Sequence, residues 1–254
     1  KSIGHTSCRW KTTGSGWSRG RAQSFSGPDW GTGDAGVLSV VDDPLAARHQ
    51  KVGLVGGAKV DEDGVPKRKT VLVERGYLKT LLTTRTPVSG ISKSTGSRRG
   101  NGPVPSNLFV ISKKTQDAKK LRKTFLKLVK DRGKDYGIVV RRIGNPSFQA
   151  LRNVGGRGRR QSSVFGVVMA YKVYRDGREE LIRNAVLSGL DASTFKDIVA
   201  VSKKSTVYHA PMRGRGATAM VSFVVPDLLF EDVSLQRPTG EVPNPPVTKH
   251  PFFD

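Results

Sequence analysis

The apolar periods along the chain, and the order in which they follow one another, limit its fold more than any other feature. Residues 70–78, TVLVERGYL, alternate apolar and polar side chains around an Arg75-Gly76 turn. This alternation is typical of a β-hairpin. Strand-like runs also occupy residues 37–44, 136–143 and 164–174. We therefore expect short strands joined by turns over much of the chain.

Two segments instead show a helical period. Residues 115–133 place Leu121, Phe125, Leu128 and Val129 on one helical face, and Gly133 ends the pattern. Residues 178–202 predict a second amphipathic helix, whose apolar positions are Leu181, Ile182, Ala185, Val186 and Leu190.

Strands return after this second helix, at residues 217–236, with an interruption predicted at Pro226. No regular alternation of strand and helix emerges from this order. The pattern favours an α+β fold with a largely antiparallel, barrel-like sheet and two amphipathic helices.

Composition divides the chain into three parts. Residues 1–36 are rich in Gly, Ser, Thr and Arg without an apolar period, which predicts a loop-rich or disordered start. Residues 37–235 form the expected folded domain. Within it, residues 89–107 are interpreted as a long glycine-rich loop. Residues 236–254 form a proline-rich, extended tail.

The charge balance brings in a nucleic-acid hypothesis. The chain has 44 Lys and Arg against 21 Asp and Glu, a formal net charge of +23. Residues 111–160 hold sixteen of the cations and three of the acids, a local balance of +13. Such a field attracts polyanions. The basic region at residues 113–160 is one candidate site, with Arg157, Arg159 and Arg160 in its glycine-rich stretch. The single short copy of that stretch, followed at once by a strand-like run, favours an exposed hairpin loop over a nucleic-acid-binding tail.

Local motifs for metal or nucleophilic chemistry are missing from the sequence. The histidines are widely spaced and form no H-E-x-x-H pair, so no metal site is assigned; they are His5, His49, His209 and His250. The sequence also lacks a G-x-S-x-G nucleophile elbow, and no catalytic residue is assigned. The stretch STGSRRGNG lacks the order of a phosphate-binding P-loop, though Arg98 and Arg99 could hold a carboxylate or a phosphate.

The lone cysteine, Cys8, gives no pair for an intrachain disulfide, and this favours the cytoplasm. No apolar run approaches the roughly 18 to 20 residues that would span a bilayer, so no membrane association is expected.

An acidic turn followed by a strand pair and a glycine-arginine stretch carries a family resemblance. The three elements of this pattern are Asp61, Glu62, Asp63 and Gly64; then Thr70, Leu72, Val73, Glu74, Gly76 and Leu78; then Ser94, Thr95, Gly96, Arg98 and Arg99. Together they resemble the C-terminal half of the TldD/TldE (PmbA) family, the "modulator of DNA gyrase" proteins. The resemblance extends over about residues 38–235, so the expected folded domain is of TldD/TldE type.

Membership would imply part of a zinc-dependent peptidase system, commonly a heterodimer, that cuts unfolded or extended peptides. The family's zinc ligands are an H-E-x-x-x-H helix in the preceding half and a cysteine in the C-terminal half. This chain has neither, and His209 lies near the expected cysteine position. The resemblance thus implies a TldE-like, metal-free subunit limited to the C-terminal half.

Such a subunit would hold no cofactor itself, with zinc only in a partner, and would form a homo- or hetero-oligomer with a TldD/TldE-type subunit. Its substrate would be unfolded peptide, held along a strand edge, with the stretch at residues 94–102 lining or gating the groove. The substrate-binding residues expected from the resemblance are Asp61, Glu62, Gly64, Thr95, Gly96, Arg98 and Arg99.

Overall fold

The structure, a computed structural model, describes residues 38–88, 90–91, 93–143, 163–182, 185–190, 192–213 and 218–236. Residues 1–36, predicted as a loop-rich start, lie outside these ranges, as does nearly all of the predicted tail. Within the described residues, no helix is long and apolar enough to cross a membrane.

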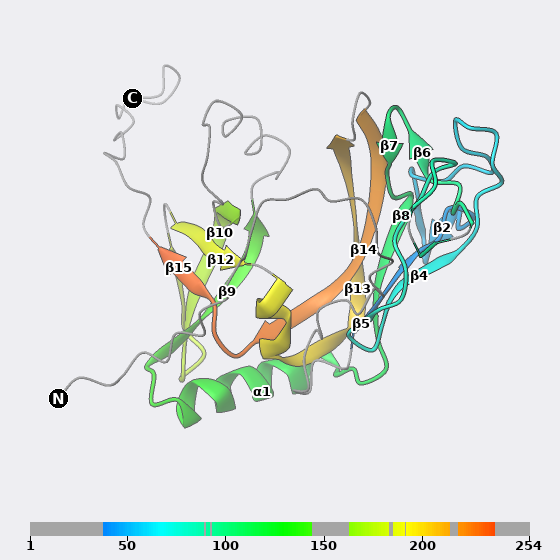
Figure 1. Cartoon of the computed structure of the whole chain (residues 1–254). Helices are drawn as coiled ribbons and strands as arrows, with labels where there is room; N and C mark the ends of the chain where they lie inside the picture. The colour runs from blue at the N-terminus through cyan, green and yellow to red at the C-terminus, as the bar shows by residue number, and fades with distance from the viewer. Residues whose placement is uncertain are drawn as a thin grey trace, which may run out of the picture.

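A six-stranded sheet forms the larger half of the molecule (Figure 1). Its strands follow the order β13-β14-β8-β1-β4-β5. Strand β14 runs parallel to β8, and every other neighbouring pair is antiparallel. In this order the strands are β13 (Ile198–Arg213), β14 (Thr218–Phe230), β8 (Asn107–Ser112), β1 (Leu38–Asp42), β4 (Thr70–Glu74) and β5 (Tyr77–Leu78).

A second sheet of five strands stands beside the first (Figure 1). Its central strand β10 pairs antiparallel with β9, β11 and β12, and β12 pairs in turn with β15. The strands are β9 (Tyr136–Ile143), β10 (Ser163–Tyr174), β11 (Glu179–Ile182), β12 (Ala185–Leu190) and β15 (Ser234–Gln236).

Helix α1 (Ala118–Asp131) runs beneath both sheets and connects β8 to β9 (Figure 1). The helix begins after Asp117, whose side chain accepts a hydrogen bond from the Lys120 amide at 2.8 Å. It ends before Gly133, which has a φ of 62°, a conformation that glycine adopts without strain. The helix predicted for residues 115–133 is therefore confirmed.

The second predicted helix was wrong. Strands β11 and β12 and the 3-10 helix η2 (Ala192–Asp197) occupy that part of the chain. Leu181 pairs with Tyr171 of β10, and Ala185 and Leu187 are both buried, which is the two-residue period of a strand. Over so short a run, apolar positions fit either period, and pairing with β10 decides between them.

The predicted interruption at Pro226 was also wrong, because β14 continues through it. Pro226 pairs with Ser205, next to the point where the register of β13 shifts between Val201 and Ser205. The Ser202 hydroxyl there accepts a hydrogen bond from the Asp227 amide at 2.8 Å. Proline is tolerated in a strand at such an irregularity, because fewer ladder hydrogen bonds are lost there.

The fold is thus α+β with mainly strands, as predicted. The sheets do not close into a barrel, and the described residues contain one α-helix where two were expected. Two small apolar clusters pack on strands of the larger sheet. One is built on Leu38, Ile198 and Val201, and the other on Val104, Ala219 and Val221.

Candidate functional site

The acidic turn that opened the family pattern is folded around Asp61. This side chain is only 8% exposed, and its carboxylate accepts hydrogen bonds from three backbone amides. The amides of Asp63 and Val65 reach Oδ1 at 2.9 Å each, and the Arg98 amide reaches Oδ2 at 3.0 Å. Gly64 allows the turn with a φ of 75°. Asp61 therefore holds its own turn and attaches it to the arginine segment.

The other two acids of the turn also contact the arginine segment. Asp63 accepts from Nη1 of Arg98 at 2.9 Å, and Glu62 accepts from the Gly100 amide at 2.6 Å. Arg98 also donates through Nε to the Gly100 carbonyl at 3.0 Å. The negative charges are consequently placed against a guanidinium and backbone donors.

Residues 89–107 do not form the long loop that was predicted. Arg98–Arg99 (β6) and Gly102–Pro103 (β7) pair as a short antiparallel hairpin. Ahead of it, the Thr83 amide donates to Thr95 Oγ1 at 2.7 Å, and the Thr95 amide donates to Thr83 Oγ1 at 3.0 Å. Thr95 is 3% exposed and Ser97 is 2% exposed.

Gly96 lies where any larger residue would collide with the neighbouring chain. Its φ is 69°, and a Cβ at this position would lie 2.8 Å from the Pro66 carbonyl oxygen. Arg99 reaches across to donate to the Gly56 carbonyl at 2.8 Å. These contacts hold the hairpin against residues 56–67.

The structure thus brings all seven predicted substrate-binding residues into one corner of the molecule. Most of their polar groups are used to hold that corner together, which favours a rigid support over a gating loop. Their contact with substrate stays a prediction.

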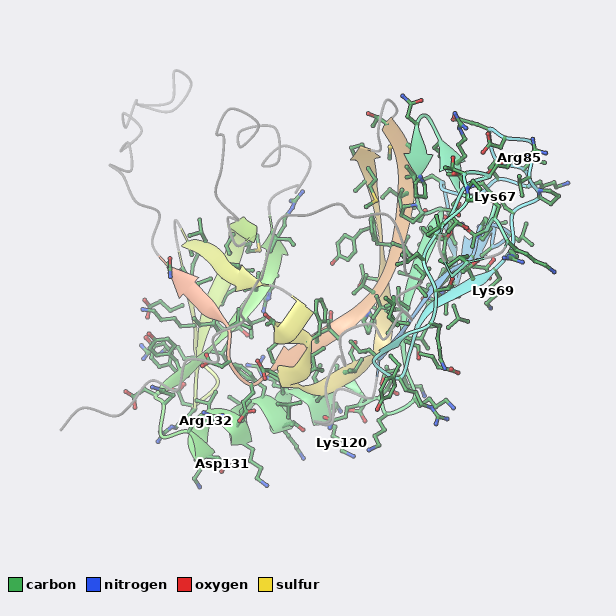
Figure 2. All side chains as sticks on the ribbon, in the orientation of Figure 1. Lys67, Lys69, Arg85, Lys120, Asp131 and Arg132 are labelled. Carbon is green, nitrogen blue, oxygen red and sulfur yellow. The ribbon has the colours of Figure 1, made fainter. Side chains whose placement is uncertain are left out.

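A buried polar cluster behind this corner was missed by sequence analysis. Asp42 is 2% exposed and Ser106 is fully buried, and the Ser106 amide donates to Asp42 Oδ1 at 2.8 Å. Lys67, 6% exposed, donates from Nζ to the Ser106 hydroxyl at 2.9 Å. The fully buried Asn107 accepts from the Gly56 amide at 3.0 Å. Figure 2 places Lys67 among the strands at this end of the larger sheet.

Burial changes the acidity of both charged members of the cluster. Loss of hydration raises the pKa of Asp42 to about 6, against the lowering effects of the Ser106 hydrogen bond and the Lys67 charge. Loss of hydration also lowers the pKa of Lys67, with the nearby Arg99 guanidinium acting in the same direction. The sequence offered one signal of this buried cluster, which is the aspartate that ends the apolar strand VLSVVD.

His209, near the position where the family places a cysteine, is an exposed residue of β13. Its Nδ1 lies 3.1 Å from the Ser222 hydroxyl, and that hydroxyl accepts from the Val55 amide at 2.8 Å. His49 lies 2.8 Å through Nε2 from Ser205 Oγ. Each of these histidines is therefore bonded to a serine.

The described part of the chain contains no group of three or more His, Cys, Asp or Glu side chains that could hold a metal ion. The donors present there do not fit the zinc that the family resemblance implies. Cys8, His5 and His250 lie outside the described ranges.

The residues proposed for nucleic-acid binding are only partly described. Arg157, Arg159 and Arg160 lie outside the described ranges. Arg122 of α1 is paired with Glu179 at 3.1 Å, and Arg132, which directly follows the helix, is paired with Glu231. Lys120 lies on the outer side of the molecule in Figure 2.

Comparison with known proteins identifies the class of domain that this fold and corner define. Residues 35–237 match the model of the PmbA/TldA metallopeptidase C-terminal domain. The chain belongs to this family. No curated protein matches the chain.

Two solved structures share the fold. A Thermotoga maritima protein, described as a modulator of a DNA gyrase, has a TM-score of 0.53 at 20% identity, with 79% of this chain and 39% of that chain covered. TldE from Thermococcus kodakarensis has a TM-score of 0.53 at 17% identity, with 82% of this chain and 41% of that chain covered. The chain thus spans about two fifths of the length of either protein.

Proposed function

We propose that this chain is a C-terminal domain of the metal-free, TldE-like kind, which binds extended peptides and works with a zinc-carrying subunit of the same family. Family membership supports the peptidase relation. The metal-free assignment rests on the sequence, in which residues 205–220 contain no cysteine. Zinc, in this proposal, belongs to the partner subunit. The lone Cys8 favours the cytoplasm as the place where the two work.

The observation that carries the peptide-binding proposal is the position of β13. Within the described residues it is an edge strand of the larger sheet, and at 16 residues it is long for an edge. Its first part is bridged by Gln116, whose amide donates to the Val201 carbonyl at 2.8 Å and whose carbonyl accepts from the Lys203 amide at 2.7 Å. Within the part that follows, residues 204–210 are where an extended peptide can add as a further strand.

Exposed apolar side chains line this part of β13. Tyr208 is 56% exposed and Met212 is 40% exposed, and both lie on one face because they are an even number of residues apart. They pair with Phe223 and Ala219 of β14, so the apolar cluster around Val221 continues to the edge. Main-chain pairing would supply affinity without a required sequence, and Tyr208 and Met212 would contact alternate side chains of the peptide.

The test is binding of an unstructured, fluorescently labelled peptide, followed by anisotropy. We expect Tyr208→Ala and Met212→Ala together to weaken binding by about tenfold, since each removes exposed apolar contact. Tyr136→Ala is a matched control, because Tyr136 is 40% exposed on β9 of the other sheet. Equal binding by the double variant, the control and the unaltered chain would contradict the proposal.

A further inference from the structure

A cavity of about 320 Å³ lies next to β5, the strand at the opposite edge of the larger sheet from β13. It forms where the chain after β5 passes the turn in which the Ile91 amide donates to the Val88 carbonyl at 3.0 Å. Its lining residues are Arg68, Leu78, Lys79, Thr80, Leu81, Gly90, Ile91 and Lys93. The volume is at the lower end of the range for small-molecule sites, which is about 300 to 1,000 Å³.

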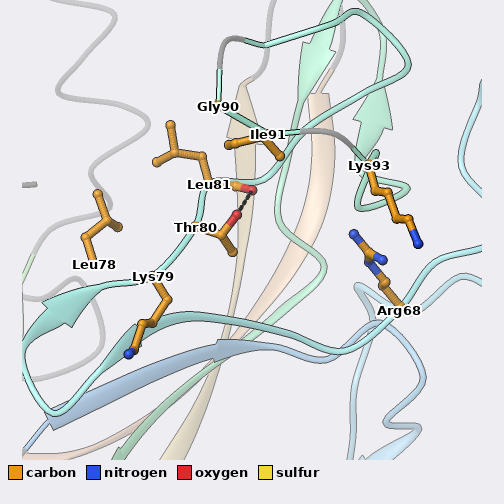
Figure 3. Close-up of a pocket in the computed structure, with 8 residues that line it drawn as sticks. All are labelled: Arg68, Leu78, Lys79, Thr80, Leu81, Gly90, Ile91 and Lys93. Atoms are coloured by element: carbon orange, nitrogen blue, oxygen red, sulfur yellow. Dashed lines mark hydrogen bonds between the residues drawn. The ribbon is translucent and has the colours of Figure 1, made fainter. Parts of the chain in front are cut away.

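The lining combines positive charge with an apolar wall. Figure 3 shows Arg68 and Lys93 toward one side of the cavity, with Leu78, Leu81 and Ile91 toward the other. None of the described residues that line it is acidic.

The counter-charges around the cavity are incomplete. Lys79 has Glu74 as an ion-pair partner at 3.2 Å. Arg68 and Lys93 form no ion pair with any residue in the described ranges. Both side chains are exposed at the rim, so water hydrates them when the cavity is empty and an anion bound there can be reached by both.

We propose that this cavity binds a carboxylate carried on a short apolar chain, with Arg68 and Lys93 on the carboxylate and Leu78, Leu81 and Ile91 around the apolar part. The arginine fork matches the two oxygens of a carboxylate, and the lysine adds a second positive charge. Such a ligand is either the apolar C-terminal residue of a peptide or a free aliphatic acid. The cavity is separated from β13 by the width of the sheet, so this proposal goes beyond strand addition at β13.

Calorimetric titration of the full chain tests the proposal with three probes. N-acetyl-alanyl-leucine carries the carboxylate. Its C-terminal amide has the same carbon skeleton, with an uncharged NH2 donor in place of one carboxylate oxygen. The third probe, 4-methylpentanoate, has the carboxylate and the leucine-like carbons without a peptide bond. We expect the acid to bind at least about tenfold more tightly than its amide, because a charge-assisted pair is lost in the amide. Binding of 4-methylpentanoate would assign the site to aliphatic acids generally, and its failure would assign it to peptide C-termini.

Arg68→Gln with Lys93→Gln should remove most of the preference for the acid over the amide. Lys51→Gln with Lys59→Gln changes the net charge equally at exposed sites outside the cavity and should leave the preference intact. The proposal would be overturned if the acid and its amide bound equally, or if neither carboxylate bound. It would also be overturned if both double variants lost the preference for the acid equally, or if inorganic phosphate bound more tightly than the acid. These titrations do not depend on Tyr208 or Met212 of β13. A negative result would therefore count against the cavity proposal and leave peptide binding along β13 to its own test.

Discussion

Arg98 donates to Asp63 at 2.9 Å and so joins two segments that are 35 residues apart in the chain. The Asp63 side chain is 13% exposed and the Arg98 side chain is 36% exposed, so water screens the pair only in part. Acids at residues 61–63 stand out in a chain of net charge +23. Their contacts with Arg98 of β6 and with Gly100 in the hairpin turn give them a structural reason: they fix the acidic turn against the hairpin.

Asp61 should be the most important acid of this turn for stability. Asp61→Ala would leave three backbone amides without their acceptor at a site that is 8% exposed. We expect the free energy of unfolding to fall by about 2 to 4 kcal/mol, since a buried donor without a partner costs about 1 to 3 kcal/mol and relaxation recovers part of the sum. Urea denaturation followed by circular dichroism measures the change.

Glu62→Ala is the control in the same turn. Glu62 is exposed and accepts one hydrogen bond, from the Gly100 amide, so water can replace the carboxylate. We expect a loss of about 1 kcal/mol or less. A loss as large as that of Asp61→Ala would mean that burial does not distinguish the two acids.

Two glycines test the close approach of the chain at Gly96. Gly96 and Gly64 have φ values of 69° and 75°, so alanine meets a similar conformational penalty at both, of about 1 to 2 kcal/mol. A Cβ at Gly96 would also lie 2.8 Å from the Pro66 carbonyl oxygen, whereas a Cβ at Gly64 has nothing within 4 Å. Gly96→Ala should therefore reduce the free energy of unfolding by about 1 to 3 kcal/mol more than Gly64→Ala.

Thermal unfolding of the two glycine variants, followed by circular dichroism, provides the comparison. Similar melting temperatures for both would show that residues 94–97 do not pack against Pro66 and Lys67 as the structure has them.

Asp42 should make stability depend on pH in a direction opposite to that of an ion-paired carboxylate. Its pKa is raised from 3.8 to about 6 in the folded state. Well below pH 3.8 the group is protonated in both states. As the pH rises toward 6, the unfolded chain ionises first, so this group lowers the free energy of unfolding, by up to about 3 kcal/mol above pH 6.

Asp42→Asn removes the titration and keeps an oxygen that can accept from the Ser106 amide. We compare the free energy of unfolding of this variant with that of the unaltered chain at each pH. The difference, variant minus unaltered, should rise by up to about 3 kcal/mol between pH 4 and pH 7, whatever the difference is at pH 4. Urea denaturation across this range measures the difference. A difference that stays constant or falls with pH would contradict the raised pKa.

Local patterns predicted the elements whose cause is local. The Arg75-Gly76 turn has φ values of 50° and 82°, which match the two-residue hairpin turn expected there, and Gly133 ends α1 as expected. The helix predicted for residues 178–190 was wrong although its pairing partner β10 directly precedes it, with Val173 opposite Glu179 and Ala170 opposite Ile182. Their short apolar run cannot by itself distinguish a helix from two strands.

In the candidate site, too, some residues could be predicted from the sequence and others could not. The residues of the acidic turn and the arginine hairpin could be singled out, because their spacing forms a family pattern. The cluster of Asp42, Lys67 and Ser106 could not, because three separate segments bring its members together only after folding. Its charges are buried, and a sequence does not show which charged residues lose their hydration.

Peptide cleavage by a zinc-carrying subunit of the PmbA/TldD family, measured with and without this chain, tests the central proposal most directly. An unstructured fluorogenic peptide is the substrate, and size-exclusion chromatography of the mixture follows assembly. We expect the two chains to co-elute, the mixture to cleave the peptide faster than the zinc subunit alone, and this chain alone to be inactive. The zinc-carrying subunit is taken from the same organism as this chain. If the two chains then elute separately and the cleavage rate is unchanged, the central proposal is contradicted.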